Sequence, residues 1–136
     1  MANKKRYATG SRSPAVQKPD QEARWLRLLM ALTLVPMVIG GLLILGWALD
    51  IYLWGDGSTQ IYIGLLFILV SFAVSNGLQK KWYAAAGWTL LAISDLLLLI
   101  FVNLPTQVIA LSIGAAGLLL LGIEFYRRWR AQANAV

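Results

Sequence analysis

The sequence is dominated by four apolar runs, each about as long as a lipid bilayer is thick. They cover residues 28–49, 61–78, 82–102 and 106–126. An α-helix rises about 1.5 Å per residue and the hydrocarbon core is about 30 Å thick, so a spanning helix needs about 20 residues. The first two runs contain no charged residue, and the other two contain one each, Asp95 and Glu124. The runs therefore predict an all-α membrane protein with four transmembrane helices.

The segments between the runs are short and rich in turn-forming residues. Gly55–Ser58 has the composition of a turn, Gln79–Lys81 joins the second run to the third, and Asn103–Pro105 joins the third to the fourth. Short connections place consecutive helices antiparallel. The prediction is an up-down-up-down four-helix bundle, in which Pro36 kinks the first span.

Charged residues are few, and all the basic ones fall on one side of the predicted membrane. Only 13% of the residues are charged, against about 25% in a typical soluble domain, and 12 Lys and Arg outnumber 6 Asp and Glu. A basic chain of this kind suggests nucleic acid only where the bases form a solvated face. Here all the bases fall before the first span, between the second and third, or after the fourth: Lys4, Lys5, Arg6, Arg12, Lys18, Arg24, Arg27, Lys80, Lys81, Arg127, Arg128 and Arg130. The positive-inside rule therefore predicts both termini in the cytoplasm of a bacterial inner membrane, cytoplasmic or photosynthetic, and no nucleic-acid partner.

Aromatic and basic side chains mark the expected membrane boundaries. Trp25, Trp82 and Trp129 mark the inner interface, while Trp47, Tyr52, Trp54 and Tyr62 mark the outer one. The cluster of Arg127, Arg128 and Arg130 is expected to reach anionic lipid headgroups, with Glu124 paired to Arg127 or Arg128 along the helix. Residues 1–24 are expected to form a flexible basic cytoplasmic tail, residues 25–130 the membrane domain, and residues 131–136 a short cytoplasmic tail.

The composition removes many forms of chemistry. The chain has no Cys and no His, and it has no phosphate-binding loop, zinc-protease motif or nucleophile elbow. We therefore expect a non-enzyme without an intrinsic cofactor or metal. Contact with a lipid, quinone or pigment stays open, but a haem or pigment would take its axial ligand mainly from other chains.

Asp95 is the one ionisable residue deep within a span. By helix rise it lies about 20 Å from Trp82 and about 12 Å from Asn103. A carboxylate at that depth costs about 2.5 to 3.5 kcal/mol, so it should face protein or water. Ser71 and Ser112 lie at similar depths on the second and fourth spans, which predicts a polar contact among the three. That contact is either a proton or cation site or a structural hydrogen bond within or between subunits.

Small residues recur at helix-packing spacing on the second and fourth spans. They are Ser71, Ala73, Ser75 and Gly77 on the second, and Ala110, Gly114 and Gly117 on the fourth. Such spacing lets helix backbones approach closely in lipid. The sequence leaves open whether these faces pack within the chain or against another subunit.

These features favour a non-catalytic accessory subunit of a larger energy-transducing membrane complex, respiratory or photosynthetic, with other membrane subunits and anionic lipids as partners. One alternative is a small homo-oligomeric proton-coupled transporter or channel that uses Asp95. Another is a membrane-complex assembly factor that recruits its partner through the basic tail.

Overall fold

The computed structural model describes residues 18–53 and 55–135, which form four long helices. These are α1 (Lys18–Ala48), α2 (Gly57–Leu78), α3 (Trp82–Ile100) and α4 (Leu104–Asn134). By length and composition, all four are able to cross a membrane. The predicted all-helical character, with four helices long and apolar enough to span a membrane, is therefore confirmed.

Both terminal helices extend beyond the apolar runs. Helix α1 begins at Lys18 and so includes part of the expected N-terminal tail, while residues 1–17 lie outside the described part of the chain. Helix α4 continues to Asn134, into the expected C-terminal tail. In α4 an i,i+4 ion pair between Glu124 and Arg128 supports the polar extension, with Nε and Oε1 2.9 Å apart. Helix α1 is assigned as one continuous helix through Pro36.

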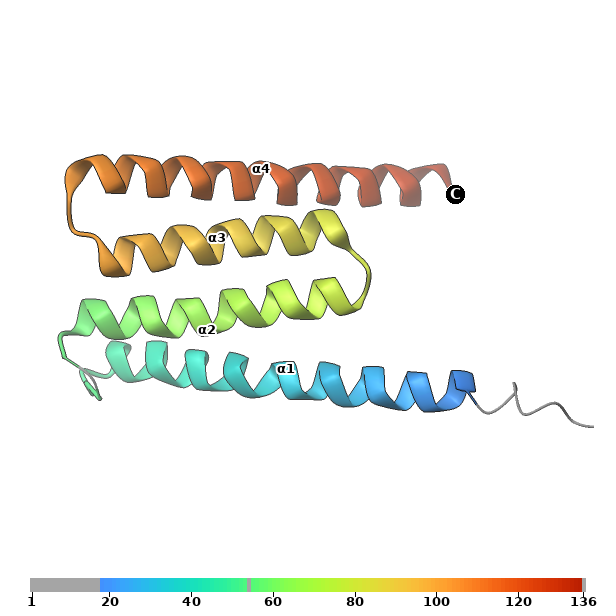
Figure 1. Ribbon diagram of the computed structural model, residues 1–136, viewed down its shortest axis with the longest axis horizontal. Helices are drawn as coiled ribbons and strands as arrows, with labels where there is room; N and C mark the ends of the chain where they lie inside the picture. The colour runs from blue at the N-terminus through green and yellow to red at the C-terminus, as the bar shows by residue number, and fades with distance from the viewer. Residues whose placement is uncertain (1–17, 54, 136) are drawn as a thin grey trace, which may run out of the picture.

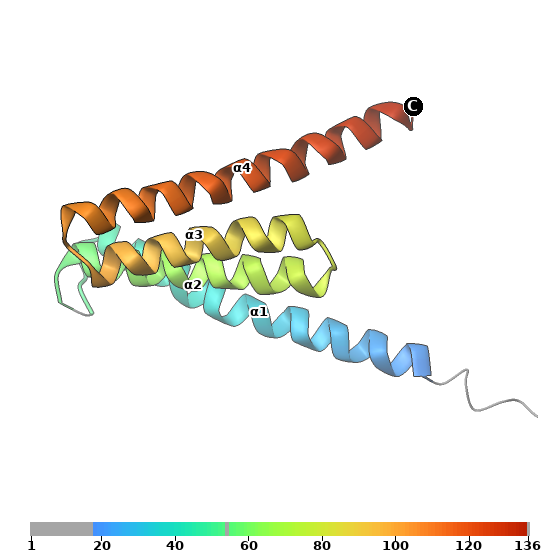
Figure 2. The ribbon, with the colours of Figure 1, turned by 45° about the horizontal axis from the view of Figure 1, so that its top comes forward.

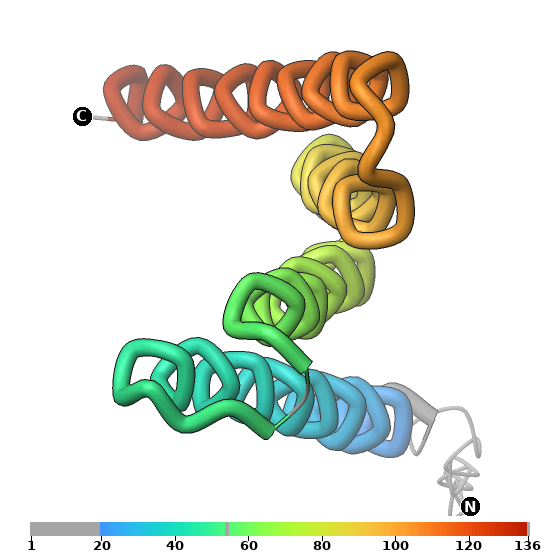
Figure 3. The backbone as a smooth tube through the Cα atoms, turned by 90° about the vertical axis from the view of Figure 1, so that its left-hand side faces the viewer, coloured from blue at the N-terminus to red at the C-terminus, as the bar shows by residue number. Residues whose placement is uncertain are grey.

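The helices lie in an open row, in the order in which they occur along the chain. Consecutive helices run in opposite directions. The N-terminal end of α1 and the C-terminal end of α4 therefore lie on the same side of the molecule (Figure 1). The view along the helices shows them one after another, with α1 and α4 at opposite edges (Figure 3). Contacts between helices join α1 to α2, α2 to α3 and α3 to α4, and no other pair among the described residues. Each terminal helix therefore packs against a single neighbour.

Two of the three reversals use the same helix ending. After α1, Asp50 adopts φ +56°, while the amide of Ile51 bonds to the carbonyl of Gly46 (2.8 Å) and that of Asp50 to the carbonyl of Trp47 (3.1 Å). After α2, Lys80 adopts φ +58°, and the amides of Lys81 and Lys80 make the corresponding bonds to the carbonyls of Asn76 and Gly77, both 2.9 Å. This is the Schellman motif, which normally has Gly at the left-handed position. Asp50 and Lys80 hold that position without glycine, at a conformational cost.

Close backbone contacts between glycines join the first and last helix pairs. A Cβ atom at Gly64 would lie 2.8 Å from the carbonyl oxygen of Gly40, and one at Gly40 would collide with the carbonyl oxygen of Gly64. On the other side of the row, a Cβ atom at Gly117 would lie 2.8 Å from the carbonyl oxygen of Gly87. Small residues at such contacts allow the van der Waals packing that drives helix association in lipid.

The central pair, α2 and α3, packs through larger side chains. The rings of Phe72 and Trp88 stack with centroids 4.8 Å apart and planes inclined by 21°. Toward the connection between α2 and α3, α1 and α4 diverge from their neighbours (Figure 2). The buried apolar residues are few and mostly small, namely Leu43, Leu69, Ala84, Ala92 and Ala110. The row is thus one helix thick, and most of its apolar side chains face outward.

Candidate functional site

Asp95 is buried in the structure. Its residue surface is 4% exposed, and its Oδ2 atom has no hydrogen-bond partner within the described residues. A buried polar atom normally has a partner, because leaving one unpaired costs about 1–3 kcal/mol. Among the described residues, Asp95 is therefore the one with a buried side-chain atom that lacks a hydrogen-bond partner.

Asp95 lies in a groove between α2 and α3 with a volume of about 340 Å³. Leucine side chains make up most of the wall, and the polar residues are Tyr62, Ser94 and Asp95 itself. The complete lining is Tyr62, Leu65 and Leu69 from α2 with Leu91, Ser94, Asp95 and Leu98 from α3. The groove combines an apolar wall with a single acidic group.

The predicted contact of Asp95 with Ser71 and Ser112 is not formed. The hydroxyl of Ser71 donates to the carbonyl oxygen of Phe67 (2.7 Å), and that of Ser112 to the carbonyl oxygen of Val108 (2.8 Å). Both bonds run back along the residue's own helix. Ser71 is buried beside α1 and Ser112 is exposed on α4, so the similar depths expected from helix rise do not bring the three side chains together.

Ser94, the residue before Asp95, makes the polar contact between helices instead. Its hydroxyl donates to the carbonyl oxygen of Ala110 on α4 at 2.6 Å. A Cβ atom at Gly114 would approach the same hydroxyl to 2.9 Å. Ala110, Gly114 and Gly117, which have helix-packing spacing in the sequence, all lie buried at the α3–α4 contact. Sequence reasoning missed Ser94 because it considered no residue of the third span other than Asp95 at this depth.

On α2, the small residues have different surroundings. Ser71 lines an apolar groove of about 370 Å³ between α1 and α2, together with Pro36 and Leu78. Ala73, Ser75 and Gly77 are partly exposed, and a Cβ atom at Gly77 would lie 4.0 Å from that of Ala85, an ordinary contact. Close backbone contact of α2 with a neighbouring helix is therefore found at Gly64 and not at Gly77.

Gln60 is a buried polar residue that the sequence did not reveal. It is fully buried, and its Nε2 atom donates to the carbonyl oxygens of Leu43 (2.8 Å) and Ile51 (3.0 Å). Its Oε1 atom accepts from the amide of Leu53 at 2.8 Å. Gln60 thus ties the segment after α1 to the first turns of α2. The available signal was an amide side chain close to a connection whose backbone groups need partners.

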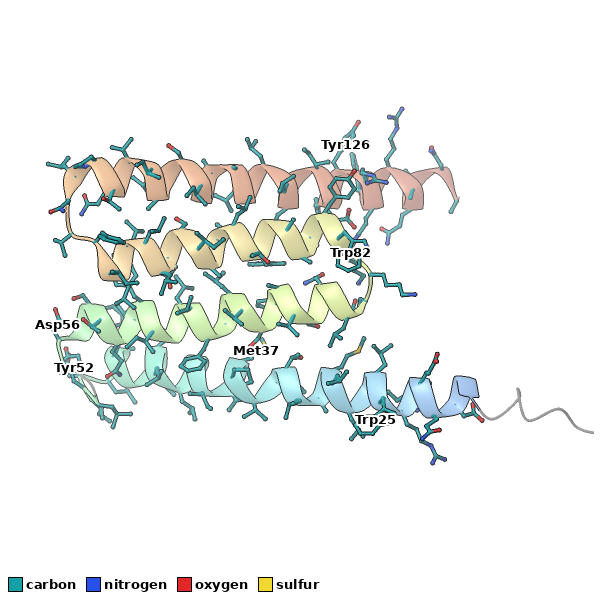
Figure 4. The ribbon with its side chains drawn as sticks, in the orientation of Figure 1. Trp25, Met37, Tyr52, Asp56, Trp82 and Tyr126 are labelled. Atoms are coloured by element: carbon teal, nitrogen blue, oxygen red, sulfur yellow. The ribbon has the colours of Figure 1, made fainter. Side chains whose placement is uncertain are left out.

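The two sides of the molecule at which the helices begin and end differ in their residues. Figure 4 shows Trp25, Trp82 and Tyr126 toward the side where α1 begins and α4 ends, and Tyr52 and Asp56 at the opposite side. Trp25, Trp82 and Trp129 are 62%, 70% and 63% exposed, as anchors at a membrane boundary would be. Trp47 is also exposed, and Trp54 lies outside the described residues.

Two arginine side chains on the side where α4 ends make contacts within the chain. The guanidinium of Arg127 lies 5.0 Å from the centre of the Tyr83 ring, and Arg128 pairs with Glu124, as the sequence predicted. Arg130 is exposed. At the opposite end Asp56 caps α2, and its pKa is lowered to about 2 by hydrogen bonds from the Thr59 hydroxyl, the Ser58 hydroxyl and the Thr59 amide.

Metal ligands do not gather anywhere in residues 18–53 and 55–135. Comparison of the chain with protein-family models, with curated proteins and with solved structures gives no match. The residues of the chain are therefore the basis for any statement about its function.

Proposed function

We propose that this chain is a non-catalytic accessory subunit of a larger membrane-protein complex. The observation that supports the proposal is the open row, in which α1 and α4 each contact one neighbouring helix. A closed four-helix bundle places every helix against two others. An open row leaves one side of each terminal helix to be covered by lipid or by another protein.

Small exposed residues on the terminal helices favour protein over lipid. Gly41 on α1 and Gly122 on α4 are exposed, and a Cβ atom at either would meet nothing within 4 Å. In lipid, apolar burial alone gives helices little reason to associate, and small residues at close approaches supply packing instead. These two glycines make no such approach within the chain, which leaves them available to a partner helix.

The proposed orientation has both termini and the connection at Lys80–Lys81 in the cytoplasm. It is supported by the positions of the basic residues along the sequence. Arg127, Arg128 and Arg130 then lie at the cytoplasmic boundary, where anionic lipid headgroups attract them. We further propose an energy-transducing complex as the setting, because the chain is small and has no motif for chemistry of its own.

The direct test is purification of the tagged chain from its native membrane in mild detergent, followed by native gel electrophoresis and mass spectrometry. The proposal expects a species much larger than 15.0 kDa with partner subunits in fixed ratio. Migration only as a monomer or homodimer would contradict it.

Two variants sharpen this experiment. Gly41→Leu and Gly122→Leu add bulk only at exposed positions of α1 and α4, so both should leave the stability of the isolated chain unchanged. At least one of them should release the chain from the complex. If both variants assemble like the wild type, the surfaces around Gly41 and Gly122 do not form the interface.

A second candidate function, a small proton-coupled transporter or channel, is favoured by the buried, unpartnered carboxylate of Asp95. Intramembrane acids of this kind commonly belong to ion or proton pathways. The test is proton-coupled flux in vesicles reconstituted with the wild type and with Asp95→Asn. Transport should be lost in the variant, and flux that survives the change would remove this candidate.

A further inference from the structure

We propose that the groove between α2 and α3 is a binding site for a hydrophobic organic cation, a compact hydrocarbon carrying one ammonium group that hydrogen-bonds to Asp95. The site is distinct from the exposed surfaces of α1 and α4 on which the accessory-subunit proposal rests. Either proposal can therefore fail without the other.

The charge of Asp95 has no complement within the membrane-spanning runs. None of the four apolar runs contains a Lys or Arg, and Glu124, the one other charged residue in them, pairs with Arg128. A buried carboxylate without a partner is strongly disfavoured in an apolar medium. A bound cation supplies the charge that the chain lacks at this place.

An ammonium group satisfies the site better than a proton alone. A proton would neutralise Asp95, but the resulting hydroxyl would still need an acceptor, and Oδ2 has no partner among the described residues. The neighbouring hydroxyl of Ser94 is already committed to the carbonyl of Ala110. A ligand ammonium neutralises the carboxylate and donates to it, a charge-assisted bond that is stronger than a neutral one.

The walls of the groove define the rest of the ligand. Leu65, Leu69, Leu91 and Leu98 offer only hydrocarbon surface, and the volume of about 340 Å³ falls at the small end of ligand pockets. Tyr62 adds an aromatic ring, which attracts a cation placed over its face. The occupant is thus a small, compact amine rather than a long-chain lipid or a hydrophilic metabolite.

The proposal is tested with 1-adamantylamine, a compact hydrocarbon cage with one ammonium group at neutral pH. The full chain is placed in nanodiscs of neutral phosphatidylcholine, and binding of the labelled amine is measured by equilibrium dialysis against empty nanodiscs. The matched ligand is 1-adamantanol, which has the same cage without the charge. The wild type should bind the amine saturably at one site per chain and the alcohol at least about tenfold more weakly.

Four variants distinguish the groove from general partition into lipid. Asp95→Asn should weaken amine binding about tenfold or more, and Leu65→Trp should weaken it by filling the groove while leaving the carboxylate intact. Tyr62→Leu removes the aromatic face and should weaken binding of the amine more than binding of the alcohol. Asp56→Asn, which alters an exposed acid outside the groove, should bind like the wild type.

Circular dichroism of each variant shows whether the helices are retained, and a variant that unfolds is replaced by Leu98→Phe or Asp95→Gln. Equal binding of the amine by the wild type and by a folded Asp95 variant would overturn the proposal. Equal binding of amine and alcohol, or no saturable binding of the amine, would overturn it as well.

Discussion

The two outer helix pairs use the same kind of contact at different distances from their turns. In the α1–α2 pair the contact of Gly40 with Gly64 lies about 12 Å from the connecting segment, and Gln60 fixes that segment from within. In the α3–α4 pair the contact of Gly87 with Gly117 lies about 20 Å from the connection, and Ser94 adds a hydrogen bond between the helices at a point between that contact and the connection. The first pair is held near its turn and the second along its length.

This difference accounts for where the two helices of each outer pair move apart. Beyond Gly40, toward the N-terminus of α1, the first pair diverges and leaves the apolar groove beside Pro36 and Ser71. The second pair is in close contact from Ala110 to Leu121, and α4 leans away from α3 toward its C-terminal end, as Figure 2 shows. Stability of the first pair should therefore depend on a few residues close to one end.

The largest effect is expected from Gly40→Val. Its side chain would collide with the carbonyl of Gly64, so the α1–α2 pair must separate or shift, at a cost of about 3 kcal/mol. Gly41→Val, one residue on, is the matched control, because its side chain enters open space. Unfolding of the detergent-solubilised chain by SDS gives both free energies. A similar loss in the two variants would mean that valine acts through helix propensity rather than through the contact.

Gln60→Leu should have the next largest effect, a loss of about 2 kcal/mol. Leucine has a similar size but leaves the carbonyls of Leu43 and Ile51 and the amide of Leu53 without their bonds. The control is Gln79→Leu at the reversal between α2 and α3, where the side chain is exposed. Hydrogen exchange should increase at Ile51 and Leu53 in the first variant alone. Unchanged exchange there would show that Gln60 does not fix the segment.

Ser94→Ala tests the contact along the second pair and should cost about 1 kcal/mol, since it removes one buried hydrogen bond to Ala110. Ser112→Ala removes a bond within α4 at an exposed position and should change the free energy of unfolding by less than about 0.5 kcal/mol. The same SDS titration measures both. The reverse order would contradict the assignment of Ser94 rather than Ser112 to the helix contact.

The smallest effect is expected at the cap of α2. Because its pKa is lowered from 3.8 to about 2, ionised Asp56 stabilises the folded state above pH about 4, and this contribution is lost as the pH falls toward 2. The difference in melting temperature between the wild type and Asp56→Asn should therefore narrow over that interval. A difference that stays constant from pH 5 to pH 2 would show that the charge of Asp56 does not stabilise the cap.

Much of the fold follows from the sequence, because span length and the absence of charge are properties of single segments. The same reasoning predicted the pair of Glu124 with an arginine, which needs only helical spacing. It did not predict the contact of Gly40 with Gly64, the bond from Ser94 or the role of Gln60. Each of these depends on the rotation of one helix against the next, and depth along a span carries no information about rotation.

The predicted site shows the same limit. Asp95 was identified from its depth, and the structure places it in a groove with an unpartnered oxygen. Ser71 and Ser112 were assigned to it by depth alone, yet they lie toward α1 and on the exposed side of α4. A residue's depth follows from counting, whereas its neighbours follow from packing.

The open row itself is tested most directly by the distance between α1 and α4 in a lipid bilayer. The chain has no native cysteine, so Gly41→Cys and Ser112→Cys place one spin label on each helix, both exposed and at similar depth. A second pair, Gly77→Cys with Ala85→Cys, is a positive control for neighbouring helices, because the Cβ atoms would lie 4.0 Å apart and close enough for a disulfide bond. With axes about 8–10 Å apart at each step of the row, pulsed electron spin resonance should give an α1–α4 separation of about 25 Å. A separation of about 10 Å would mean that α1 and α4 are neighbours in a closed bundle, which would contradict the open row.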